Sequence, residues 1–410
     1  MVNGTTYLAT IDNGDIDAWT FPANAGDDIV VRAGETITGS TLLPWLRLYG
    51  PDGVLLDADF NASAAEVTTR ATKSGLFLVV IADGSGGSGG IGNYRISLAK
   101  SGTQPTISGS DEGGPMVNGT TYLAAIETGD VDQWTFSAKT GDSIIVRMGE
   151  TTAGSRLLPW LRLYGPNGVL LNSDFNAGAA EVSARATNSG LFSVVAADGS
   201  GGLAGTGNYR ISLVKTGEPL VISGNDEGGL MTGIGTYEGL IDVGDIDAWT
   251  FTACAGDILN ISLAEVPVNS ALLPWLRLYG HDGTLLKSVF SNGTTGIPNF
   301  RAPNSGYYTV VIGDGNGGLS GTGNYRLTVN GLSAGLKLCP LHIADGNITV
   351  EGIGGVPGTS LSIMTTTDLN TPRANWTPLT TGQFDQFGVF SHSKVYDAGE
   401  PQRFFLIQLP

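Results

Sequence analysis

Hydrophobic and polar residues alternate with a period of two along most of the chain. In GDDIVVRAGE, Ile29, Val31 and Ala33 share one face, and Val30 and Arg32 share the other. GLFLVVIADG and GNYRISL alternate in the same way, and Gly, Asn and Asp interrupt the pattern about every 8 to 12 residues. This pattern predicts an all-β protein made of tandem antiparallel β-sandwich, jelly-roll-like domains, with about eight strands each and no helix.

The same block occurs three times. The motif GDIDAWTF at Asp15 returns as GDVDQWTF at Asp130 and as GDIDAWTF at Asp245, a period of 115 residues that matches a whole domain. MVNGTTYLA at Met1 also recurs at Met116, so we expect the chain to begin at a processed or trimmed end. The predicted domains are a first module at 1–103, a leader plus second module at 104–218, a leader plus third module at 219–332, and a small C-terminal β-domain at 333–410.

Polar, Gly-rich leaders precede the second and third modules. They read SGTQPTISGSDEGGP and TGEPLVISGNDEGGL, and the first module has no counterpart within the chain. If each leader adds a strand to the module that follows, the first module has an open sheet edge. Open edges accept strands from other molecules.

Composition narrows the class of protein. Hydrophobic residues make up 41% of the chain, charged residues 14%, and 62 glycines indicate many turns. The net charge of −17 argues against a nucleic-acid partner, because no basic patch exists to displace counterions. No apolar run approaches the roughly 18 residues of a membrane span, so we expect no transmembrane segment. An acidic surface suits an extracellular protein and divalent cations.

The tail and the two cysteines form a separate feature. After about residue 333 the repeat gives way to a smaller all-β pattern, whose last strand, 404–409, is expected to be buried. Cys254 falls in a turn of the third module that we expect to be exposed, and Cys339 opens the tail. An exposed free thiol is unusual in a secreted protein, so we predict a disulfide between them. Two unpaired cysteines are the alternative.

GDIDAWTF, PWLRLYGPDGVLL and SGLFLVVIADG…GNYRISL, in this order, resemble the bacterial pre-peptidase C-terminal domain. The resemblance covers each module almost entirely, and the DEGG leaders resemble the acidic start of the family pattern. It implies secreted, non-catalytic β-sandwich modules, some of which bind calcium and some collagen or other polymers. The tail, with NWTPLTT and PQRFFLIQLP, is similar to fibronectin-like C-terminal domains of secreted proteins from environmental bacteria.

The repeated carboxylates are the first candidate chemistry. Alternation places Asp15, Asp17, Trp19 and Phe21 on one face, so Asp17 points inward at the sandwich rim and needs a partner. A loop that donates backbone N–H groups is one partner, and a calcium ion held by several oxygens is the other. The candidate calcium ligands are Asp12, Asp15, Asp17, Asp83, Asp130, Asp132, Asp198, Asp245, Asp247 and Asp314.

A Trp-Arg-Tyr stripe in PWLRLYG is the second candidate. It can pack within its own sheet with the Arg reaching water, contact a neighbouring module or subunit, or bind a sugar or peptide. The stripe residues are Trp45, Arg47 and Tyr49, Trp160, Arg162 and Tyr164, and Trp275, Arg277 and Tyr279.

Catalysis is not expected. His281, His342 and His392 do not recur at equivalent positions, and no Cys/His metal spacing is present. The sequence therefore predicts a non-enzymatic structural protein, extracellular or at a bacterial surface, that assembles head-to-tail into a filament or matrix through strand-edge contacts. The alternatives are an adhesin that binds polysaccharide or an extracellular protein such as collagen, and an accessory fragment of a larger secreted enzyme.

Overall fold

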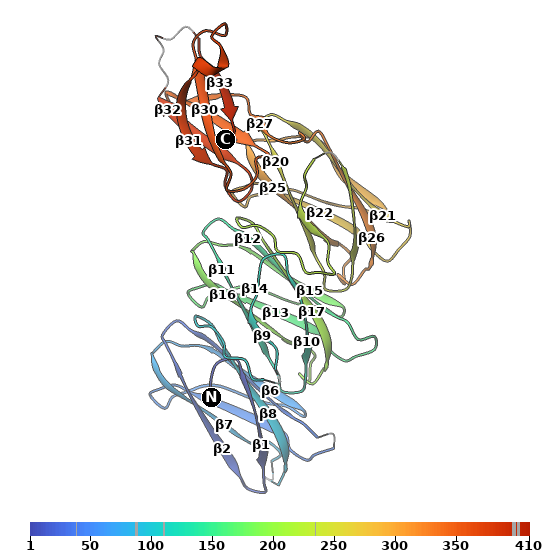
Figure 1. The fold of residues 1–410 in the computed structure, drawn as a ribbon. Coiled ribbons are helices and arrows are strands. Elements are labelled where there is room, and N and C mark those ends of the chain that lie inside the picture. Colours follow the sequence, from blue (N-terminus) through green and yellow to red (C-terminus); the bar gives the residue numbers. More distant parts are fainter. Residues whose placement is uncertain (38, 87–88, 110, 234, 396–398, 400–401) are drawn as a thin grey trace.

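The computed structural model describes residues 1–37, 39–86, 89–109, 111–233, 235–395, 399 and 402–410. Figure 1 shows three β-sandwiches following one another in chain order, with a small β-domain at the C-terminal end. The predicted all-β class of tandem sandwiches is confirmed. The described residues contain one three-residue 3-10 helix, η1 (Arg373–Asn375), and no helix with the length and hydropathy of a membrane span.

Each module pairs two antiparallel sheets, which we call the leading and the trailing sheet. In the first module the leading sheet has the order β2-β7-β4-β5 and the trailing sheet the order β1-β8-β3-β6. The strands of the first module are β1 (Thr5–Ile11), β2 (Ile16–Ala23), β3 (Asp28–Glu35), β4 (Pro44–Tyr49), β5 (Leu55–Phe60), β6 (Ala64–Arg70), β7 (Gly75–Asp83) and β8 (Gly92–Lys100).

The second and third modules repeat this topology with one strand more. The strands of the second module are β9 (Gly113–Pro115), β10 (Thr121–Ile126), β11 (Asp132–Ala138), β12 (Ser143–Glu150), β13 (Pro159–Tyr164), β14 (Leu170–Phe175), β15 (Ala179–Arg185), β16 (Gly190–Asp198) and β17 (Gly207–Lys215). Those of the third are β18 (Gly228–Leu230), β19 (Gly235–Ile241), β20 (Asp247–Ala253), β21 (Ile258–Val266), β22 (Pro274–Tyr279), β23 (Leu285–Phe290), β24 (Thr294–Arg301), β25 (Gly306–Asp314) and β26 (Gly323–Asn330).

The extra strand comes from the leader. β9 pairs in parallel with β11, and β18 pairs in parallel with β20, so each leader extends the leading sheet of the module that follows it. The leader of the second module also runs along β1, where the Thr6 amide donates to Ser108 Oγ at 3.1 Å. Among the described residues β2 has no such neighbour, so the edge of the first leading sheet is open.

The sandwich cores follow the alternation read from the sequence. Ile29, Val31 and Ala33 point into the first core together with Phe21 and Phe77, whose rings stack at 5.7 Å. The opposite face of β3 would be expected in water, yet Val30 and Arg32 are also buried. A second layer of protein therefore covers the outside of this sheet.

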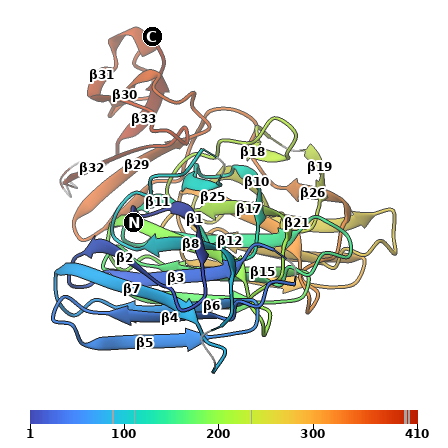
Figure 2. The ribbon, with the colours of Figure 1, turned by 90° about the horizontal axis from the view of Figure 1, so that it is seen from below.

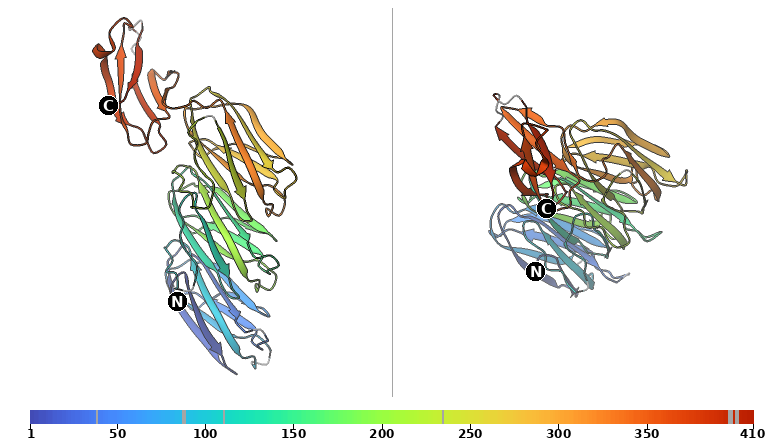
Figure 3. Two further views of the ribbon diagram at one scale, coloured as in Figure 1. Left: turned by 45° about the vertical axis from the view of Figure 1, so that its right-hand side comes forward. Right: turned by 45° about the horizontal axis from the view of Figure 1, so that its top comes forward.

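That layer is the next module. The trailing sheet of each module packs on the leading sheet of its successor, so the three sandwiches form one pile of six sheets. Figure 2, seen from below, shows the modules lying over one another, and Figure 3 shows the elongated shape that results. We call the two contacts between modules the joints. Within the part of the chain that the structure describes, the first leading sheet and the third trailing sheet have no module packed on them.

The C-terminal domain is smaller and packs two sheets over Val350, Leu361, Ile363, Phe384 and Phe390. Its last strand is half-buried rather than buried as predicted. Its strands are β27 (Lys337–Leu338), β28 (His342–Ala344), β29 (Asn347–Ile353), β30 (Ser360–Thr366), β31 (Thr377–Gln383), β32 (Phe390–Val395) and β33 (Phe404–Gln408).

Candidate functional site

The first joint is centred on a buried ionic triad. Glu66 of the first module accepts from Arg32 of its own sheet at 2.8 Å and from both terminal nitrogens of Arg162 in the second module, at 2.6 and 3.1 Å. The side chains of all three are at most 6% exposed. Trp160 lies beside them, with Arg162 at 4.1 Å and Arg32 at 5.9 Å from its ring centroid. The triad thus joins two modules by charge-assisted bonds away from water.

The second joint repeats this arrangement. Glu181 accepts from Arg147 at 2.7 Å and from Arg277 of the third module at 2.6 and 3.1 Å. Burial alone would raise the pKa of Glu181, but the charges of Arg277 and Arg147 hold it below its usual value. The carboxylate therefore stays ionised inside the joint. Arg147 also donates to the Asp314 carbonyl at 3.1 Å.

Apolar contacts surround each triad. In the first joint Val30 and Ala99 of the trailing sheet meet Val131, Tyr164 and neighbouring residues of the leading sheet. In the second joint the equivalent residues are Ile145, Val214, Ile246, Tyr279 and their neighbours. Both clusters are buried, so the modules are joined by continuous packed surfaces rather than by flexible linkers.

The glycine of the repeated Gly-Asp motif is explained by this packing. A Cβ atom on Gly34 would lie 2.5 Å from the Gly129 nitrogen, and one on Gly149 would lie 2.2 Å from the Gly244 nitrogen. Only glycines allow the two backbones to approach so closely. In the first module, the equivalent Gly14 has open space around the same position.

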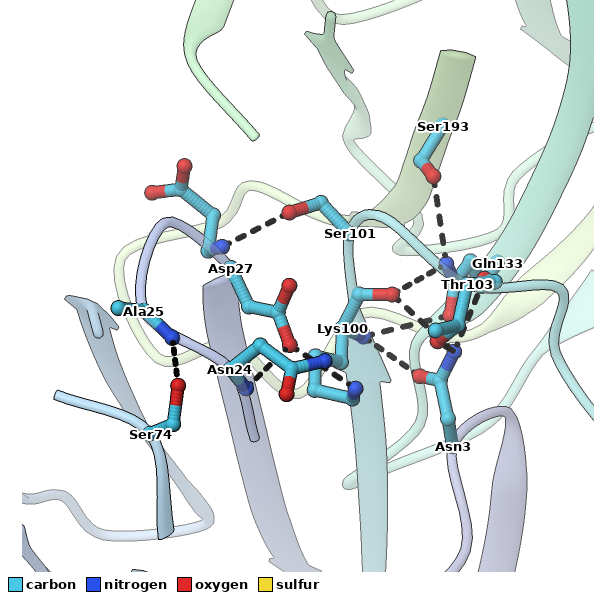
Figure 4. Close-up of polar contacts among 11 residues, drawn as sticks. Asn3, Asn24, Ala25, Asp27, Ser74, Lys100, Ser101, Thr103, Gln133 and Ser193 are labelled. Carbon is cyan, nitrogen blue, oxygen red and sulfur yellow. Dashed lines mark hydrogen bonds and ion pairs between the residues drawn. The ribbon is translucent and has the colours of Figure 1, made fainter. Parts of the chain in front are cut away.

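Polar groups close the edge of the first joint. Lys100, at the end of β8, forms a buried ion pair with Asp27 at 3.0 Å, and its carbonyl accepts from Gln133 of the second module at 2.8 Å. The Lys100 amide donates to Asn3 at 2.6 Å, and Gln133 also reaches Ser193. Figure 4 shows these side chains converging between the two modules.

A cluster of three carboxylates lies where each leader meets its module. Asp111 from the first leader joins Asp130 and Asp132, and Asp226 from the second joins Asp245 and Asp247; within each triad the ligand oxygens lie within 4.8 Å of one another. A cavity of about 310 Å³ opens beside the second triad.

Hydrogen bonds to the preceding module hold the leader carboxylates in place. Thr121 Oγ1 donates to Asp226 at 2.7 Å, and Thr6 Oγ1 bonds Asp111 in the same way. Tyr209 OH donates to the inner carboxylate, Asp132, at 2.5 Å, and Trp134 Nε1 donates in turn to Tyr209 OH. Trp134 therefore orients the Tyr209 hydroxyl, and this hydroxyl orients the Asp132 carboxylate.

The carboxylates of each triad disfavour one another's charge. Burial, and then the charge of Asp111, raises the pKa of Asp130 to about 7, and burial and Asp226 do the same for Asp245. Burial and the neighbouring carboxylate raise the pKa of Asp132 and Asp247 well above the usual range. Such groups bind a proton or a cation at neutral pH.

The triads fit a hard cation such as calcium. Asp132 Oδ1 and Asp247 Oδ1 are buried without a hydrogen-bond partner among the described residues. Oxygen-only, anionic donor sets suit Ca²⁺, and buried carboxylate oxygens without a partner are costly unless a cation or proton occupies them. The residues that would hold the cation are Asp111, Asp130 and Asp132, and Asp226, Asp245 and Asp247.

The structure brings together only part of the sequence-based ligand set. Among the described residues Asp12, Asp83, Asp198 and Asp314 belong to neither triad, and Asp15 and Asp17 form no triad in the first module. Asp17 accepts from Tyr94 OH at 2.6 Å, the same bond that Asp132 accepts from Tyr209. The sequence could not show that the third carboxylate comes from the leader.

Asp83 and its copies fasten a loop. Asp83 accepts the amides of Leu43 at 3.1 Å and Gly90 at 2.9 Å, so it holds two loops together at the end of β7. A Cβ atom on Gly90 would lie 2.3 Å from Asp83 Oδ1, which explains the glycine there. Asp198 and Asp314 make the same bonds in the other modules. The loop-fastening role proposed for the motif carboxylates thus belongs to these three residues.

The Trp-Arg-Tyr stripes divide into two groups. Arg162 and Tyr164, and Arg277 and Tyr279, are buried in the joints, whereas packing within one sheet was the first interpretation from the sequence. Trp160 and Trp275 remain half-buried beside them. Trp45, Arg47 and Tyr49 of the first module are half-buried and face outward.

Cys254 and Cys339 form a disulfide with a Cα–Cα distance of 5.3 Å. Cys254 is fully buried, so the prediction that it is exposed was wrong: the tail covers it, with Ile353 in contact. Tyr307 stacks on Phe387 of the tail at 3.6 Å. Disulfides persist outside the reducing cytoplasm, so the bond indicates an extracytoplasmic protein.

Sequence reasoning missed the partners of the stripe arginines. Glu66 and Glu181 sit in the repeated AAEV, and Arg32 and Arg147 in VR, and both signals were visible as recurring charges on apolar strands. Asp111 and Asp226 were visible in the repeated DEGG leaders, which were interpreted as possible strands and as similar to the acidic start of the family pattern, but not as metal ligands.

Comparison of the sequence with protein-family models and with curated proteins gives no match. Among solved structures, the pre-peptidase C-terminal domain of collagenase from Bacillus anthracis matches at 21% identity, covering 26% of this chain and 96% of that one, with a TM-score of 0.22. PliG of Salmonella Typhimurium, a periplasmic inhibitor of g-type lysozyme, matches at 18% identity over 25% of this chain and 96% of its own, with a TM-score of 0.18. A β-1,2-glucanase from Parabacteroides distasonis matches at 12% identity over 43% and 32% of the two chains, with a TM-score of 0.17.

Proposed function

We propose that this chain is a non-enzymatic structural protein of the bacterial exterior, a stiff segment of a surface filament or matrix built by end-to-end contact of modules. The observation that supports it most is the pair of joints, in which a buried Glu receives two Arg side chains and glycine backbones touch. The repeated charged residues thus hold modules together or fasten loops.

Calcium is the second part of the proposal. Asp111, Asp130 and Asp132 would hold a cation between a leader and the sheet that it extends, and Asp226, Asp245 and Asp247 would do so at the second joint. Calcium would supply positive charge that neutralises the triads. This chain's own residues position the ligands: the Thr6 and Thr121 hydroxyls anchor the leader carboxylates, and Tyr209 orients Asp132.

Stiffness tests the proposal directly. We expect small-angle X-ray scattering of the full chain in calcium buffer to fit one elongated shape, and single-molecule pulling to show separate module-unfolding steps at forces that fall in chelator. A chain that scatters as modules on free hinges in both buffers contradicts the structural function.

A binding module is the alternative that one observation favours, namely the outward-facing Trp45, Arg47 and Tyr49 of the first module. It predicts retention of the full chain on insoluble polysaccharide or collagen and loss of retention in Trp45→Ala. The structural proposal expects the wild type and Trp45→Ala to elute together.

A further inference from the structure

The leading face of the first module has the residues of a joint, but none of the residues that the structure describes forms a partner module on it. Ile16 is 59% exposed, whereas the equivalent Val131 and Ile246 are 3% and 4% exposed inside the joints. Ala18 is exposed where Ala248 is buried. The leading face therefore carries the same apolar positions in all three modules. It is covered in the second and third modules and exposed in the first.

The polar groups of this face also match those of a joint. Arg47 lies over Trp45 at 4.2 Å, as Arg162 lies over Trp160, but among the described residues no carboxylate lies within ion-pair distance of Arg47. Asp15 is exposed where Asp130 is buried beside a leader carboxylate. The face thus lacks one Glu, one leader strand and one leader Asp, which are the groups that a preceding module supplies at each joint.

The third trailing face cannot provide these groups from a second copy. Ser262 and Gly296 occupy the positions of Arg147 and Glu181, and the apolar pair of the joints is replaced by exposed Asn260 and Asn330. A Cβ atom at position 296 would lie 2.6 Å from the Ile261 carbonyl oxygen, so a Glu does not fit there without a backbone shift. Polar outer faces of this kind terminate repeat arrays.

The other two trailing faces are already in use. Glu66 and Glu181 are both bound within the chain, and so are both leaders. Charge complementarity and continuity with the joints therefore favour an occupant that has a trailing face of the first or second type.

We propose that the leading face of the first module is an interface for a further β-sandwich module, from outside residues 1–410, whose trailing face presents a Glu–Arg pair between small apolar residues. Its leader adds a strand along β2 and a carboxylate beside Asp15 and Asp17, and its Glu binds Arg47. This inference rests on the proposed structural function and identifies the partner through which the pile grows.

The test uses the full chain with residues 1–115 placed directly before Met1. This extension reproduces the native junction, because Pro115 is followed by Met116 in the chain and Met116 is the counterpart of Met1. We expect hydrogen exchange in peptides covering β2 and β4 to slow by about tenfold relative to the unextended chain. Core peptides of the added copy report its folding.

A matched control carries Glu66→Ala in the added copy and Arg47→Ala in the acceptor, and it should lose most of this protection. A folded added copy that leaves β2 and β4 unprotected, or an added copy that stays unfolded at its native junction, contradicts the inference.

Sedimentation of the wild-type chain examines the choice of partner. We expect it to remain monomeric at high concentration, because the third trailing face is polar. Self-association that disappears in Arg47→Glu would assign the face to a second copy and overturn the partner proposed here. The stiffness experiment depends only on the internal joints, so its failure is distinguishable from failure of this interface.

Discussion

The two outer faces of the pile are built on the same fold but have opposite characters. The first leading face keeps the joint residues Ile16, Arg47 and Tyr49, while the third trailing face replaces joint residues with Asn260 and Ser262. A sandwich topology alone therefore does not determine whether a sheet is covered. A few residues per face decide it, since a buried Arg needs a carboxylate and an exposed sheet needs polar side chains.

Removing the charge of the buried glutamate in a joint should have the largest effect on the stability of the joints. Glu181→Gln leaves Arg147 and Arg277 buried without a counter-charge, and we expect it to destabilise the second and third modules by about 4 kcal/mol. Calorimetry of the full chain measures this. Glu238→Gln, which breaks the exposed pair with Arg326, is the matched control and should change stability by less than about 0.5 kcal/mol. Equal losses of stability in the two variants would show that the buried Glu181 contributes no more than an exposed ion pair.

Shortening the apolar residue that the two faces share separates a joint from an open face. Ile246→Ala should cost about 3 kcal/mol because it leaves a cavity in the second joint. Ile16→Ala should cost less than about 0.5 kcal/mol, because Ile16 is largely in water. Urea unfolding of both variants gives the comparison, and a large loss in Ile16→Ala would mean that the first face is covered in solution.

Adding a methyl group at the contact between Gly149 and Gly244 tests whether the two backbones must approach closely. Gly149→Ala places a Cβ against the Gly244 nitrogen and should cost about 2 kcal/mol by forcing the second joint apart. Ala264→Gly, at the equivalent position of the uncovered third face, should cost about 0.5 kcal/mol, the usual penalty of glycine in a strand. Scattering should show a less compact chain only for Gly149→Ala.

The smallest expected effect is the pH dependence of the free energy of unfolding in chelator, which comes from the two clusters of three aspartates. The pKa values of Asp130 and Asp245 are raised to about 7 in the folded chain, so the unfolded chain binds fewer protons below that pH. Stability should therefore fall by about 1 kcal/mol per triad as pH rises from 6 to 7. Calcium should remove this fall, and Asp15→Asn should leave it unchanged. A chelator-treated chain that becomes more stable over this range contradicts the assignment.

The sequence was sufficient for local structure and insufficient for contacts between modules. Alternation in VVR and LFLVV predicted the strands, because burial of one face sets their period, and the 115-residue repeat revealed the modules. It could not show which sheet faces meet, since Val30 and Arg32 are as compatible with a solvated face as with a joint. The metal-type triads depend on the path of the leader, so Asp111 could be placed beside Asp130 only by the structure.

The bond between Cys254 and Cys339 changes how the chain would lengthen under tension. It closes a stretch of 85 residues that contains β21 to β26, so a pull from end to end bypasses most of the third module. While the bond is intact, these 85 residues cannot be extended, which removes about 280 Å of contour length at roughly 3.3 Å per residue. The first two modules and the segments outside the cross-link, including the tail after Cys339, can still extend, so most of the third module is the inextensible part of the molecule.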